Sequence, residues 1–205
     1  MSQPNSRERL ISAALRLFAE KGIKGTSVRT LCDEAEVGLN MVVHHFGSKE
    51  GLVSEILRTA SPEMYHTPLR VISEPARDAA DFQVRMRLFC EETLQSILDH
   101  EDLLTIVYNW SEVMHLPAYK EAMQGVVRYQ QAFTEFLESA RAIGVVRGDA
   151  DLSMIGGLLW DRFATAVLHR RPITQIFEGA DIADPDFRGP WIQANVDIFL
   201  RGVLA

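Results

Sequence analysis

The fold of this chain is decided by residues 26–49, which read TSVRTLCDEAEVGLNMVVHHFGSK. Apolar residues with helical spacing occur before Gly38, and a second segment with helical spacing follows it. Ala35 and Val37 flank the turn, where small and branched side chains let two helices cross closely. The stretch therefore predicts a helix, a tight turn and a second helix. Such a pair can place its second helix in the major groove of double-stranded DNA.

The second helix of this pair has an apolar side and a polar side. Val42 and Phe46 are four residues apart, so both are expected to face the core. The opposite side then offers an amide, a thioether and two imidazoles to base edges or phosphates, from Asn40, Met41, His44 and His45. Asparagine can bind adenine through two hydrogen bonds, and methionine can contact the methyl group of thymine. A solvent-exposed histidine pair is the alternative, and no third metal ligand lies nearby at a suitable spacing.

Residues at two expected helix starts are candidates for phosphate contacts. Lys49 begins a helix, where free backbone N–H groups and the helix dipole already favour anions. Thr26 and Ser27 offer hydroxyl groups at another helix start. Capping of the helix is the alternative role for Thr26, as it is for Ser48, because hydroxyl side chains commonly cap helices.

Outward from this stretch, the chain predicts further helices and no sheet. Proline-free windows at residues 5–61, 76–116 and 118–171 permit long helices, and runs of alternating β-branched residues are short. We expect helices at 6–21, from Val28, and at 39–46, 49–60, 78–98, 101–114, 117–143, 151–170 and 190–204, with a connector at 61–76 and a loop at 172–190. The predicted fold class is all-α. A three-helix, helix-turn-helix head at residues 1–48 is joined by a fourth helix to a larger helical domain, within residues 49–205.

Charge is unevenly distributed along the chain. The 205 residues include 21 basic and 28 acidic side chains, a net charge of -7, which argues against a protein that coats nucleic acid through bulk charge. Residues 1–58 contain 8 basic and 7 acidic residues, a net of +1, whereas residues 59–205 contain 13 and 21, a net of -8. We therefore expect a nearly neutral head whose DNA binding depends on groove fit and a few placed groups, and is sensitive to salt.

Several classes of protein lack support in the sequence. Cys32 and Cys90 lie far apart in helical patterns, which excludes a disulfide framework and a cysteine-rich zinc module. No apolar run reaches about 18 residues and the N-terminus is polar, so we expect no membrane span, no signal peptide and a cytoplasmic location. Motifs for phosphate loops, nucleophile elbows and zinc helices are also missing. The sequence thus indicates no enzyme, no catalytic residue, no metal site and no cofactor.

Residues 7–57 closely resemble the N-terminal DNA-binding region of the TetR family of bacterial transcriptional regulators. The resemblance is carried, in order and spacing, by LFAEKG at 17–22, TSVR at 26–29, AEV at 35–37 and HFGSKEGL at 45–52. His45 and Lys49 match family positions that approach phosphates. The resemblance also implies that the rest of the chain is a divergent helical domain for ligand binding and dimerisation.

The chain departs from the family pattern on the expected recognition helix. Val43 stands where the family commonly has Tyr, Asn40 where it often has Gly, and Gly38-Leu39 where it often has Ser-Lys. These changes remove a typical backbone or thymine-methyl contact and a cation. The operator sequence therefore does not carry over from the family, whereas the DNA-binding role does. Leu39, Val43 and Arg29 occupy DNA-facing family positions and complete the expected DNA-binding set.

The resemblance implies a ligand-responsive transcriptional regulator, in this family usually a repressor that a small-molecule effector releases from a palindromic operator. The alternative is a helical ligand-binding protein or enzyme that no longer binds specific DNA, including a regulator that signals through protein contacts. Binding to one genomic DNA sequence would support the regulator. Turnover of a bound small molecule would support the enzyme.

The expected effector pocket is apolar. Aromatic side chains and flexible methionines with a few polar tips suit such a pocket. The candidates are Met86, Phe89, Tyr108, Trp110, Met114, His115, Met123 and Tyr129. The alternative is that these are ordinary core residues, since aromatic and methionine residues at helical spacing are mostly buried in cores.

The last two expected long helices are candidates for a homodimer interface. The candidate residues are Leu152, Ile155, Gly156, Leu159, Phe163, Trp191 and Phe199. Gly156 and Gly157 each cost the helix about 1 kcal/mol relative to Ala, and close approach of another helix would explain that cost. Core of the monomer is the alternative role for this stripe. A two-fold dimer would present two recognition helices about 34–36 Å apart to a palindromic operator.

Overall fold

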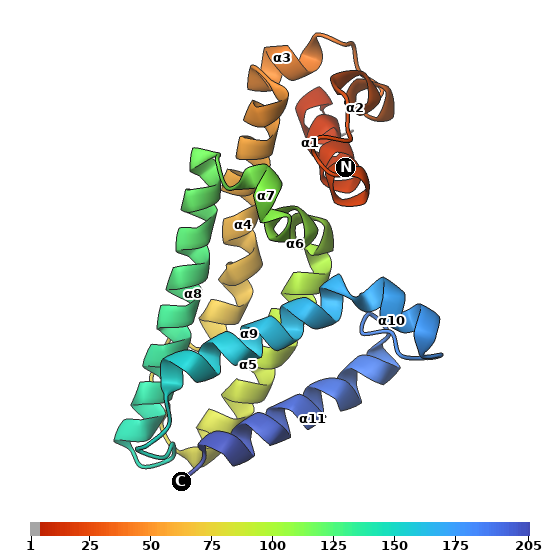
Figure 1. Cartoon of the computed structure of the whole chain (residues 1–205). Helices are drawn as coiled ribbons and strands as arrows, with labels where there is room; N and C mark the ends of the chain where they lie inside the picture. The colour runs from red at the N-terminus through yellow and green to blue at the C-terminus, as the bar shows by residue number, and fades with distance from the viewer. Residues whose placement is uncertain (1–4) are drawn as a thin grey trace. The chain divides into compact units, whose positions relative to one another are not determined.

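The computed structural model describes residues 5–205, and this part of the chain is built of helices, as the sequence predicts (Figure 1). The helices are α1 Ser6–Lys21, α2 Val28–Glu34, α3 Met41–Phe46, α4 Lys49–Val71, α5 Ala79–Asp99, α6 Glu101–Tyr108, α7 Trp110–Val113, α8 Pro117–Ala142, α9 Leu152–Leu168, α10 Arg170–Ile176 and α11 Pro185–Val203. An isolated antiparallel bridge pairs Val146 with Leu204, and the described residues form no longer strand.

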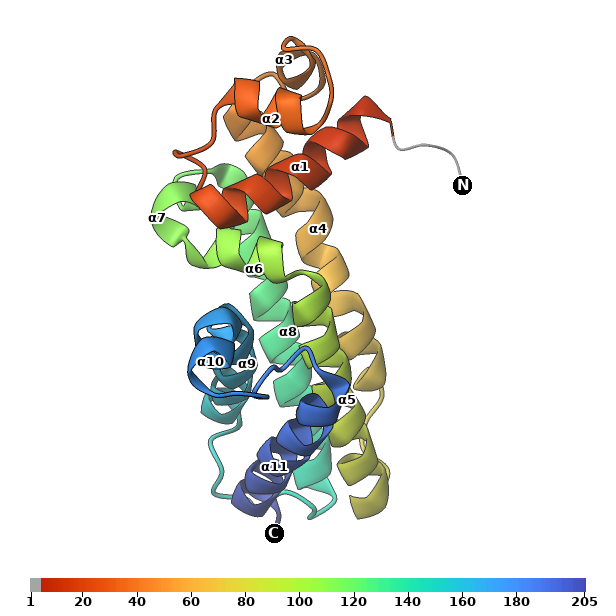
Figure 2. The ribbon, with the colours of Figure 1, turned by 90° about the vertical axis from the view of Figure 1, so that its right-hand side faces the viewer.

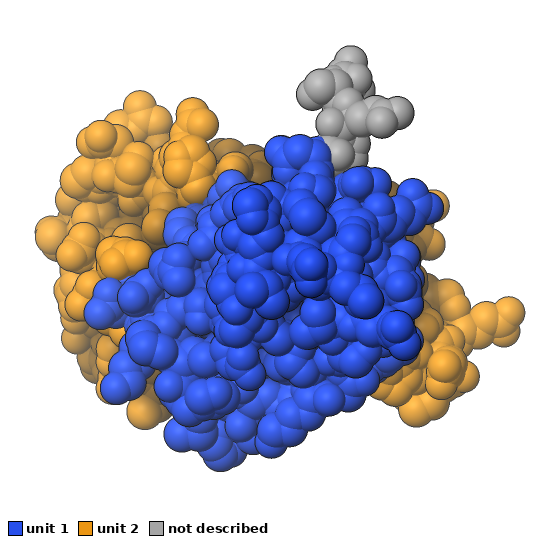
Figure 3. Space-filling view, turned by 90° about the horizontal axis from the view of Figure 1, so that it is seen from above, with its two compact units in different colours: residues 1–63, 100–125 blue, residues 64–99, 126–205 orange. Residues whose placement is uncertain are grey.

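The helices are grouped into two compact units, which Figure 3 colours separately. The first unit comprises the residues up to Glu63 together with His100–Gly125, and the second comprises Met64–Asp99 and Val126–Ala205. Helices α6 and α7 therefore belong to the same unit as α1–α3, although they are far away in the sequence. The functional boundary expected after residue 48 stays a prediction, because compactness alone does not assign a function.

Local capping signals set the ends of the first helices. The Asn5 side chain accepts hydrogen bonds from the backbone N–H groups of Arg7 and Glu8, and the Glu8 carboxylate accepts one from the Asn5 N–H. This reciprocal capping box begins α1. Gly22, at φ 73°, ends α1, and Gly47, at φ 76°, ends α3. The bounds expected for the first helix, 6–21, are confirmed.

Helix α4 is longer than the sequence predicts, so the expected connector at residues 61–76 is corrected. The helix continues through two prolines. Pro68 has no N–H to donate to the carbonyl of Met64, but the Ser96 hydroxyl donates to that carbonyl at 2.7 Å. Pro62 is exposed, where water can bind the carbonyl that it leaves free. At Pro68, the Ser96 hydroxyl thus replaces the lost hydrogen bond.

Two other expected elements also differ from the structure. The expected helix 101–114 is broken at Asn109 into α6 and α7. The expected loop at 172–190 contains most of α10 and the start of α11. The Asp184 side chain caps α11 and Pro185 stands in its first turn, where the missing N–H of proline has no cost. Pro185, which the sequence analysis placed in a loop, therefore begins α11.

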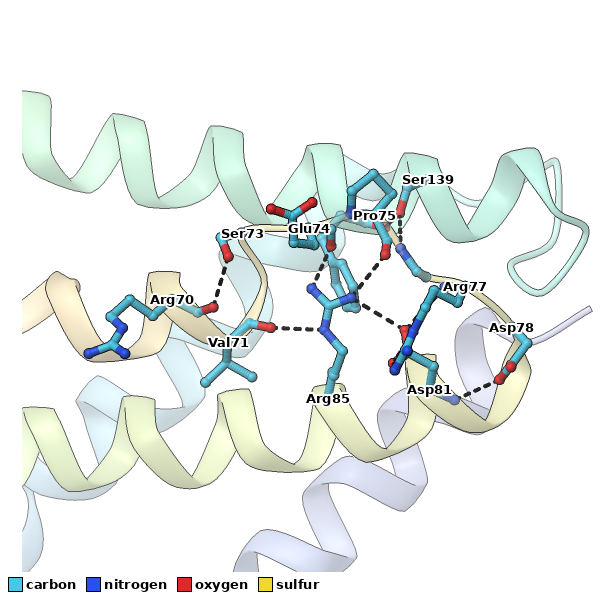
Figure 4. A network of polar contacts seen from close by, with 12 residues as sticks. Arg70, Val71, Ser73, Glu74, Pro75, Arg77, Asp78, Asp81, Arg85 and Ser139 are labelled. Carbon is cyan, nitrogen blue, oxygen red and sulfur yellow. Dashed lines mark hydrogen bonds and ion pairs between the residues drawn. The ribbon is translucent and has the colours of Figure 1, made fainter.

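The turn between α4 and α5 is held by the Arg85 guanidinium (Figure 4). It donates to backbone carbonyls of three turn residues: Val71 at 2.9 Å, Pro75 at 3.0 Å, and Glu74. Its central carbon lies 4.6 Å from the centroid of the Phe136 ring, a cation–π contact. Asp81 binds both Arg77 and Arg85, and the hydrogen bond from Arg77 lowers the pKa of Asp81 to about 2. Polar contacts thus fix this turn of the second unit.

Candidate DNA-binding surface

Helices α1–α3 enclose a small apolar core that orients α3. Its buried members are Leu10, Ala13, Cys32, Ala35 and Val42. Phe46 packs against the same cluster, so the inward side predicted from the four-residue spacing of Val42 and Phe46 is confirmed. The predicted helix, tight turn and second helix are all present. The remaining side of α3 is left to face solvent.

The turn between α2 and α3 contains a non-glycine residue with a positive φ angle. The left-handed backbone conformation belongs to Glu36, at φ 51°, and Gly38 does not adopt it. The Val37 N–H donates to the Cys32 carbonyl at 2.9 Å, which closes the end of α2. A residue with a Cβ in this conformation costs about 1 kcal/mol relative to glycine. Packing of the helix pair offsets that strain.

The outer side of α3 and of the residues just before it combines apolar and polar groups. Leu39 is 50% exposed and Val43 is 63% exposed, so two large apolar side chains face solvent. Asn40 and His44 are exposed as well. The Asn40 side chain makes no capping hydrogen bond, which leaves its amide available to an external partner. Met41, expected on this side, is instead partly buried against the core.

His45 is placed differently from His44. It is half-buried, and its Nε2 lies 2.8 Å from the Ser6 hydroxyl oxygen. The two imidazole rings meet edge to face, with centroids 4.9 Å apart. His45 therefore connects α3 to the first turn of α1, whereas His44 keeps its exposed position.

The structure does not support the expected contact between Lys49 and phosphate. The Lys49 ammonium donates to the backbone carbonyls of Ile23 at 2.8 Å and Thr26 at 2.9 Å. Two of its three donors are thus used inside the first unit, and the side chain is half-buried. Lys49 fixes the start of α4 to the loop between α1 and α2, residues 22–27.

Thr26 is also an internal residue, and this corrects its expected exposure at a helix start. It is 1% exposed, and its hydroxyl donates to the carbonyls of Gly22 at 2.9 Å and Leu17 at 3.2 Å. The cap of α2 is Ser27, whose side chain accepts a hydrogen bond from the Thr30 N–H at 3.0 Å. Ser27 and the nearby Arg29 are exposed, so both stay accessible to a phosphate backbone.

Glu112 on α7 belongs to this region, although no sequence pattern indicated it. Its carboxylate accepts hydrogen bonds from the backbone N–H groups of Ile23 at 2.7 Å and Lys24 at 3.3 Å. Ile23 is 89 residues earlier in the chain, so no local motif could have indicated the contact. Only folding brings this carboxylate to the loop.

Glu50 contributes a negative charge at the start of α4. Its own backbone N–H and the Ser48 hydroxyl hydrogen-bond to the carboxylate, and both lower the pKa of Glu50. The carboxylate is therefore ionised close to a region in which Lys49 is bound internally. The start of α4 therefore adds no free positive charge at this point, and the expectation that DNA binding depends on groove fit stays a prediction.

The eight candidate effector residues are divided between the two units. In the first unit Tyr108, Trp110, Met114 and His115 are exposed, the first three by 42%, 59% and 49%, and Met123 is half-buried. In the second unit Met86, Phe89 and Tyr129 are buried. The structure therefore does not bring the eight residues together within one unit.

The buried candidates are part of an aromatic core in the second unit. The Tyr129 ring centroid lies 5.4 Å from that of Phe89 and 5.2 Å from that of Trp160. The Tyr129 hydroxyl lies 2.8 Å from the Thr93 hydroxyl, and burial raises the pKa of the Tyr129 phenol. Phe89 and Tyr129 serve as core residues here, which is the alternative that the sequence left open.

The predicted dimer stripe on α9 is corrected by the structure. The members buried within the second unit are Leu152, Gly156, Leu159 and Phe163. A Cβ atom on Gly156 would lie 2.8 Å from Oε1 of Gln130 and 3.0 Å from the Phe133 side chain, both on α8. Gly156 does permit a close helix approach, but the approaching helix belongs to the same chain. A Cβ atom on Gly157 would instead lie in open space.

The other side of α9, together with α11, is apolar and exposed. Met154 and Leu158 are each 65% exposed, and Ile198 on α11 is 73% exposed. The remaining dimer candidates, Ile155, Trp191 and Phe199, are half-buried. Trp191 packs within the unit, and the central carbon of the Arg162 guanidinium lies 4.8 Å from the centroid of its ring. None of Met154, Leu158 and Ile198 was among the dimer candidates predicted from the sequence.

The described residues contain no group of three or more His, Cys, Asp and Glu side chains placed to hold a metal ion. In the same part of the chain, no helix is both long enough and apolar enough to cross a lipid bilayer.

Known proteins match the sequence of this chain. The family model described as "Bacterial regulatory proteins, tetR family" matches residues 10–56. The HTH-type transcriptional repressor KstR2 of Rhodococcus jostii is 27% identical over 169 residues, which cover 81% of this chain and 80% of the relative. The HTH-type transcriptional regulator BetI of Burkholderia thailandensis is 29% identical over 170 residues, which cover 78% of this chain and 82% of the relative.

A solved structure matches the fold. The ketosteroid transcriptional regulator KstR2 of Mycobacterium tuberculosis superposes with a TM-score of 0.76 at 20% sequence identity. The superposition covers 100% of this chain and 97% of that chain. At this identity the likeness establishes the fold alone.

Proposed function

The chain belongs to the TetR family of bacterial transcriptional regulators, and from this premise we propose that it is a repressor released from a palindromic operator by a small-molecule effector. Relatives are named transcriptional repressors and regulators, and the family match covers the helix-turn-helix of α2 and α3. The protein is a DNA-binding regulator and not an enzyme. As a protein that acts on bacterial DNA, it would work in the cytoplasm.

The observation that carries the proposal is the exposed face formed by Leu39, Asn40, Val43 and His44. The major groove is about 12 Å wide and admits one helix, so this face can reach base edges. Leu39 and Val43 suit the methyl groups of thymine, and the Asn40 amide suits adenine. We therefore expect A·T pairs at the centre of each half-site, with Ser27 and Arg29 on the phosphate backbone.

A homodimer would hold two such faces at the spacing of an operator. We place its interface on the exposed side of α9 and α11, at Met154, Leu158 and Ile198. Large apolar side chains exposed on neighbouring helices are candidates for an interface. A second copy of the chain is the occupant, because a two-fold axis pairs one patch with itself and sets two recognition helices about 34–36 Å apart.

The effector is proposed to be a mainly apolar molecule. The Mycobacterium tuberculosis relative is called a ketosteroid transcriptional regulator, and Trp110 and Met114 offer exposed apolar surface near the break between α6 and α7. Binding that shifts α4 would change the spacing of the recognition helices. A coupling free energy of about 1–3 kcal/mol would change operator affinity about 5- to 150-fold.

Selection from random DNA duplexes tests the DNA-binding part of the proposal. We expect enrichment of a palindrome with half-sites one helical turn apart, or a multiple of that spacing. Replacing the contacted thymine by uracil, which lacks the methyl group, should weaken wild-type binding but have little effect on a Val43→Ala variant. Val84→Ala is the matched control, since Val84 is 59% exposed in the second unit, and its operator affinity should equal that of the wild type.

Two outcomes would contradict the proposal. If no sequence is enriched, the alternative of a helical ligand-binding protein or enzyme without specific DNA binding gains support. For the effector, thermal shifts with a panel of ketosteroids would identify a ligand. If such a ligand binds while operator affinity at saturation stays unchanged, release by that effector is wrong.

A further inference from the structure

The loop between α1 and α2, residues 22–27, is bound by the carboxylate of Glu112. Both carboxylate oxygens take part, since Oε2 accepts from the Ile23 N–H at 2.7 Å and Oε1 from the Lys24 N–H at 3.3 Å. Gly22 makes room for this approach, because a Cβ atom at that position would lie 3.2 Å from Oε2. A residue of the loop, Gly22, thus leaves the space that the Glu112 carboxylate occupies.

The position of Glu112 depends on the break between α6 and α7. Asn109 ends α6 and precedes α7, and its side-chain amide donates to Oε2 of Glu112 at 3.2 Å. The backbone carbonyl of Asn109 also accepts a hydrogen bond from the Glu112 N–H at 3.0 Å. The same residue that interrupts the helix therefore orients the carboxylate toward the loop.

The loop in turn sets the position of the helix-turn-helix. It ends at Ser27, which caps α2, and its buried Thr26 hydroxyl binds carbonyls at the end of α1. Lys49 binds the same loop, at the carbonyls of Ile23 and Thr26. Because α2 and α3 share one core, a displacement of the loop would move the exposed face of α3.

Helices α6 and α7 are well placed to displace the loop. Figures 1 and 2 both show α1 beside α6, and the two helices contact each other. The same short helix that carries Glu112 begins with Trp110, which is 59% exposed, and Met114 follows it with 49% exposure. A molecule that binds these apolar side chains would act on the helix that holds the carboxylate.

We propose that Glu112 is a positioning residue for DNA binding, and that its contact with the loop is where the α6–α7 segment acts on the recognition helix α3. The inference rests on the proposed function and names a point of its regulation. Glu112 acts through the backbone of Ile23 and Lys24, without touching DNA.

The sign of the effect separates positioning from simple electrostatics. DNA is negatively charged, so removing a carboxylate strengthens binding if charge alone matters. If Glu112 positions the loop, its removal weakens operator binding even though the net charge becomes more favourable.

The test compares Glu112→Gln with Glu121→Gln in the full chain. Both variants remove one carboxylate from the first unit, but Glu121 is exposed and makes only an ion pair with Arg58 at 3.7 Å. For Glu112→Gln we expect operator affinity about tenfold lower, and amide protons of Ile23 and Lys24 that exchange about tenfold faster. For Glu121→Gln we expect both quantities within about twofold of the wild type.

Hydrogen exchange, measured by NMR without DNA, reports on the contact independently of the operator. A wild-type chain that binds no selected duplex overturns the proposed function and the inference with it. Wild-type binding together with unchanged or higher affinity of Glu112→Gln, or with unprotected Ile23 and Lys24 amides, overturns the inference alone. Glu112→Asp keeps the charge on a shorter side chain, so its operator affinity and amide exchange rates should lie between those of the wild type and Glu112→Gln. It supplies the same measurements if Glu112→Gln does not fold.

Discussion

Helices α3 and α9 both expose apolar side chains, but their inner faces are fixed in different ways. Helix α3 has 6 residues, and Val42 anchors it in a core supplied by α1 and α2. Helix α9 has 17 residues, and its buried side packs against α5 and α8, which come from earlier parts of the chain. The inner face of α3 is thus set by the two helices just before it, whereas that of α9 is set by α8, which precedes it, and also by α5, which lies much earlier in the chain.

The two helices also differ in how apolar they are around their circumference. The side of α3 opposite Val42 includes Asn40 and His44, so the choice of inner face is clear. Helix α9 has one apolar stripe with Leu159 and Phe163 and another with Met154 and Leu158. A helix that is apolar on two sides needs two partners. Here the first partner is the core of the second unit, and the proposed second partner is another copy of the chain.

The largest expected effect comes from the buried stripe of α9. Phe163 has no exposed surface, so Phe163→Ala should lower the free energy of unfolding by about 3–5 kcal/mol through lost burial and a cavity. Urea denaturation monitored by circular dichroism measures this change. The result would establish the stripe as core.

Leu158→Ala is the matched control on the exposed stripe of the same helix. At concentrations where the protein is monomeric, it should change the free energy of unfolding by less than about 0.5 kcal/mol. It should nevertheless raise the dimer dissociation constant about tenfold or more, measured by sedimentation. A large loss of monomer stability from Leu158→Ala, with little from Phe163→Ala, would reverse the assignment of the two stripes.

A smaller effect is expected in the first unit, at Lys49. Lys49→Met removes two charge-assisted hydrogen bonds to backbone carbonyls, so the free energy of unfolding should fall by about 1.5–3 kcal/mol. Lys24→Met is the control, because the Lys24 side chain is exposed, and it should change stability by less than about 0.5 kcal/mol.

The salt dependence of operator binding distinguishes the two roles of Lys49. If its ammonium is bound inside the protein, the slope of log affinity against log salt should be the same for Lys49→Met and the wild type. A slope reduced by about 1 per subunit would instead place the ammonium on a phosphate.

The smallest effect is expected at Asp81 and is confined to low pH. Its folded-state pKa is about 2, below the ordinary value of 3.8, because Arg77 binds the carboxylate. The stabilisation is therefore complete above about pH 5 and is lost as the pH falls through 3.8 toward 2. Arg77 is 82% exposed, so solvent weakens the interaction. The stability difference between the wild type and Asp81→Asn, followed from pH 6 to pH 2, should shrink in that window. A difference that is constant across it would show that the ion pair does not contribute.

Capping and periodicity explain which parts of the fold could be predicted. The first helix begins at the capping box of Asn5 and Glu8 and ends at Gly22, and all three signals lie within the segment itself. The prolines of α4 were misleading because the contact that compensates for one of them is not local. The Ser96 hydroxyl that compensates for Pro68 belongs to α5, so the sequence near Pro68 could not reveal it.

The candidate site also contains residues whose position could be predicted from local sequence and residues whose position could not. Asn40 and His44 are exposed where helical periodicity places them, and Val43 where the family resemblance places it, because Val42 had one apolar side to pack against. Thr26 looked like an exposed cap and is buried, since carbonyls at the end of α1 accept its hydroxyl hydrogen. A residue type with two common uses cannot be assigned to one of them without its neighbours in space.

By itself, the sequence determined the all-α class, the helix-turn-helix and the side of α3 that faces outward. These properties follow from interactions within a few turns of chain, which leave a periodic pattern. Only the tertiary structure decided that Lys49 and Glu112 hold the same loop, that α4 continues through its prolines, and which stripe of α9 is core. Each of these depends on a hydrogen bond or packing contact between residues distant in sequence, and such contacts leave no local pattern.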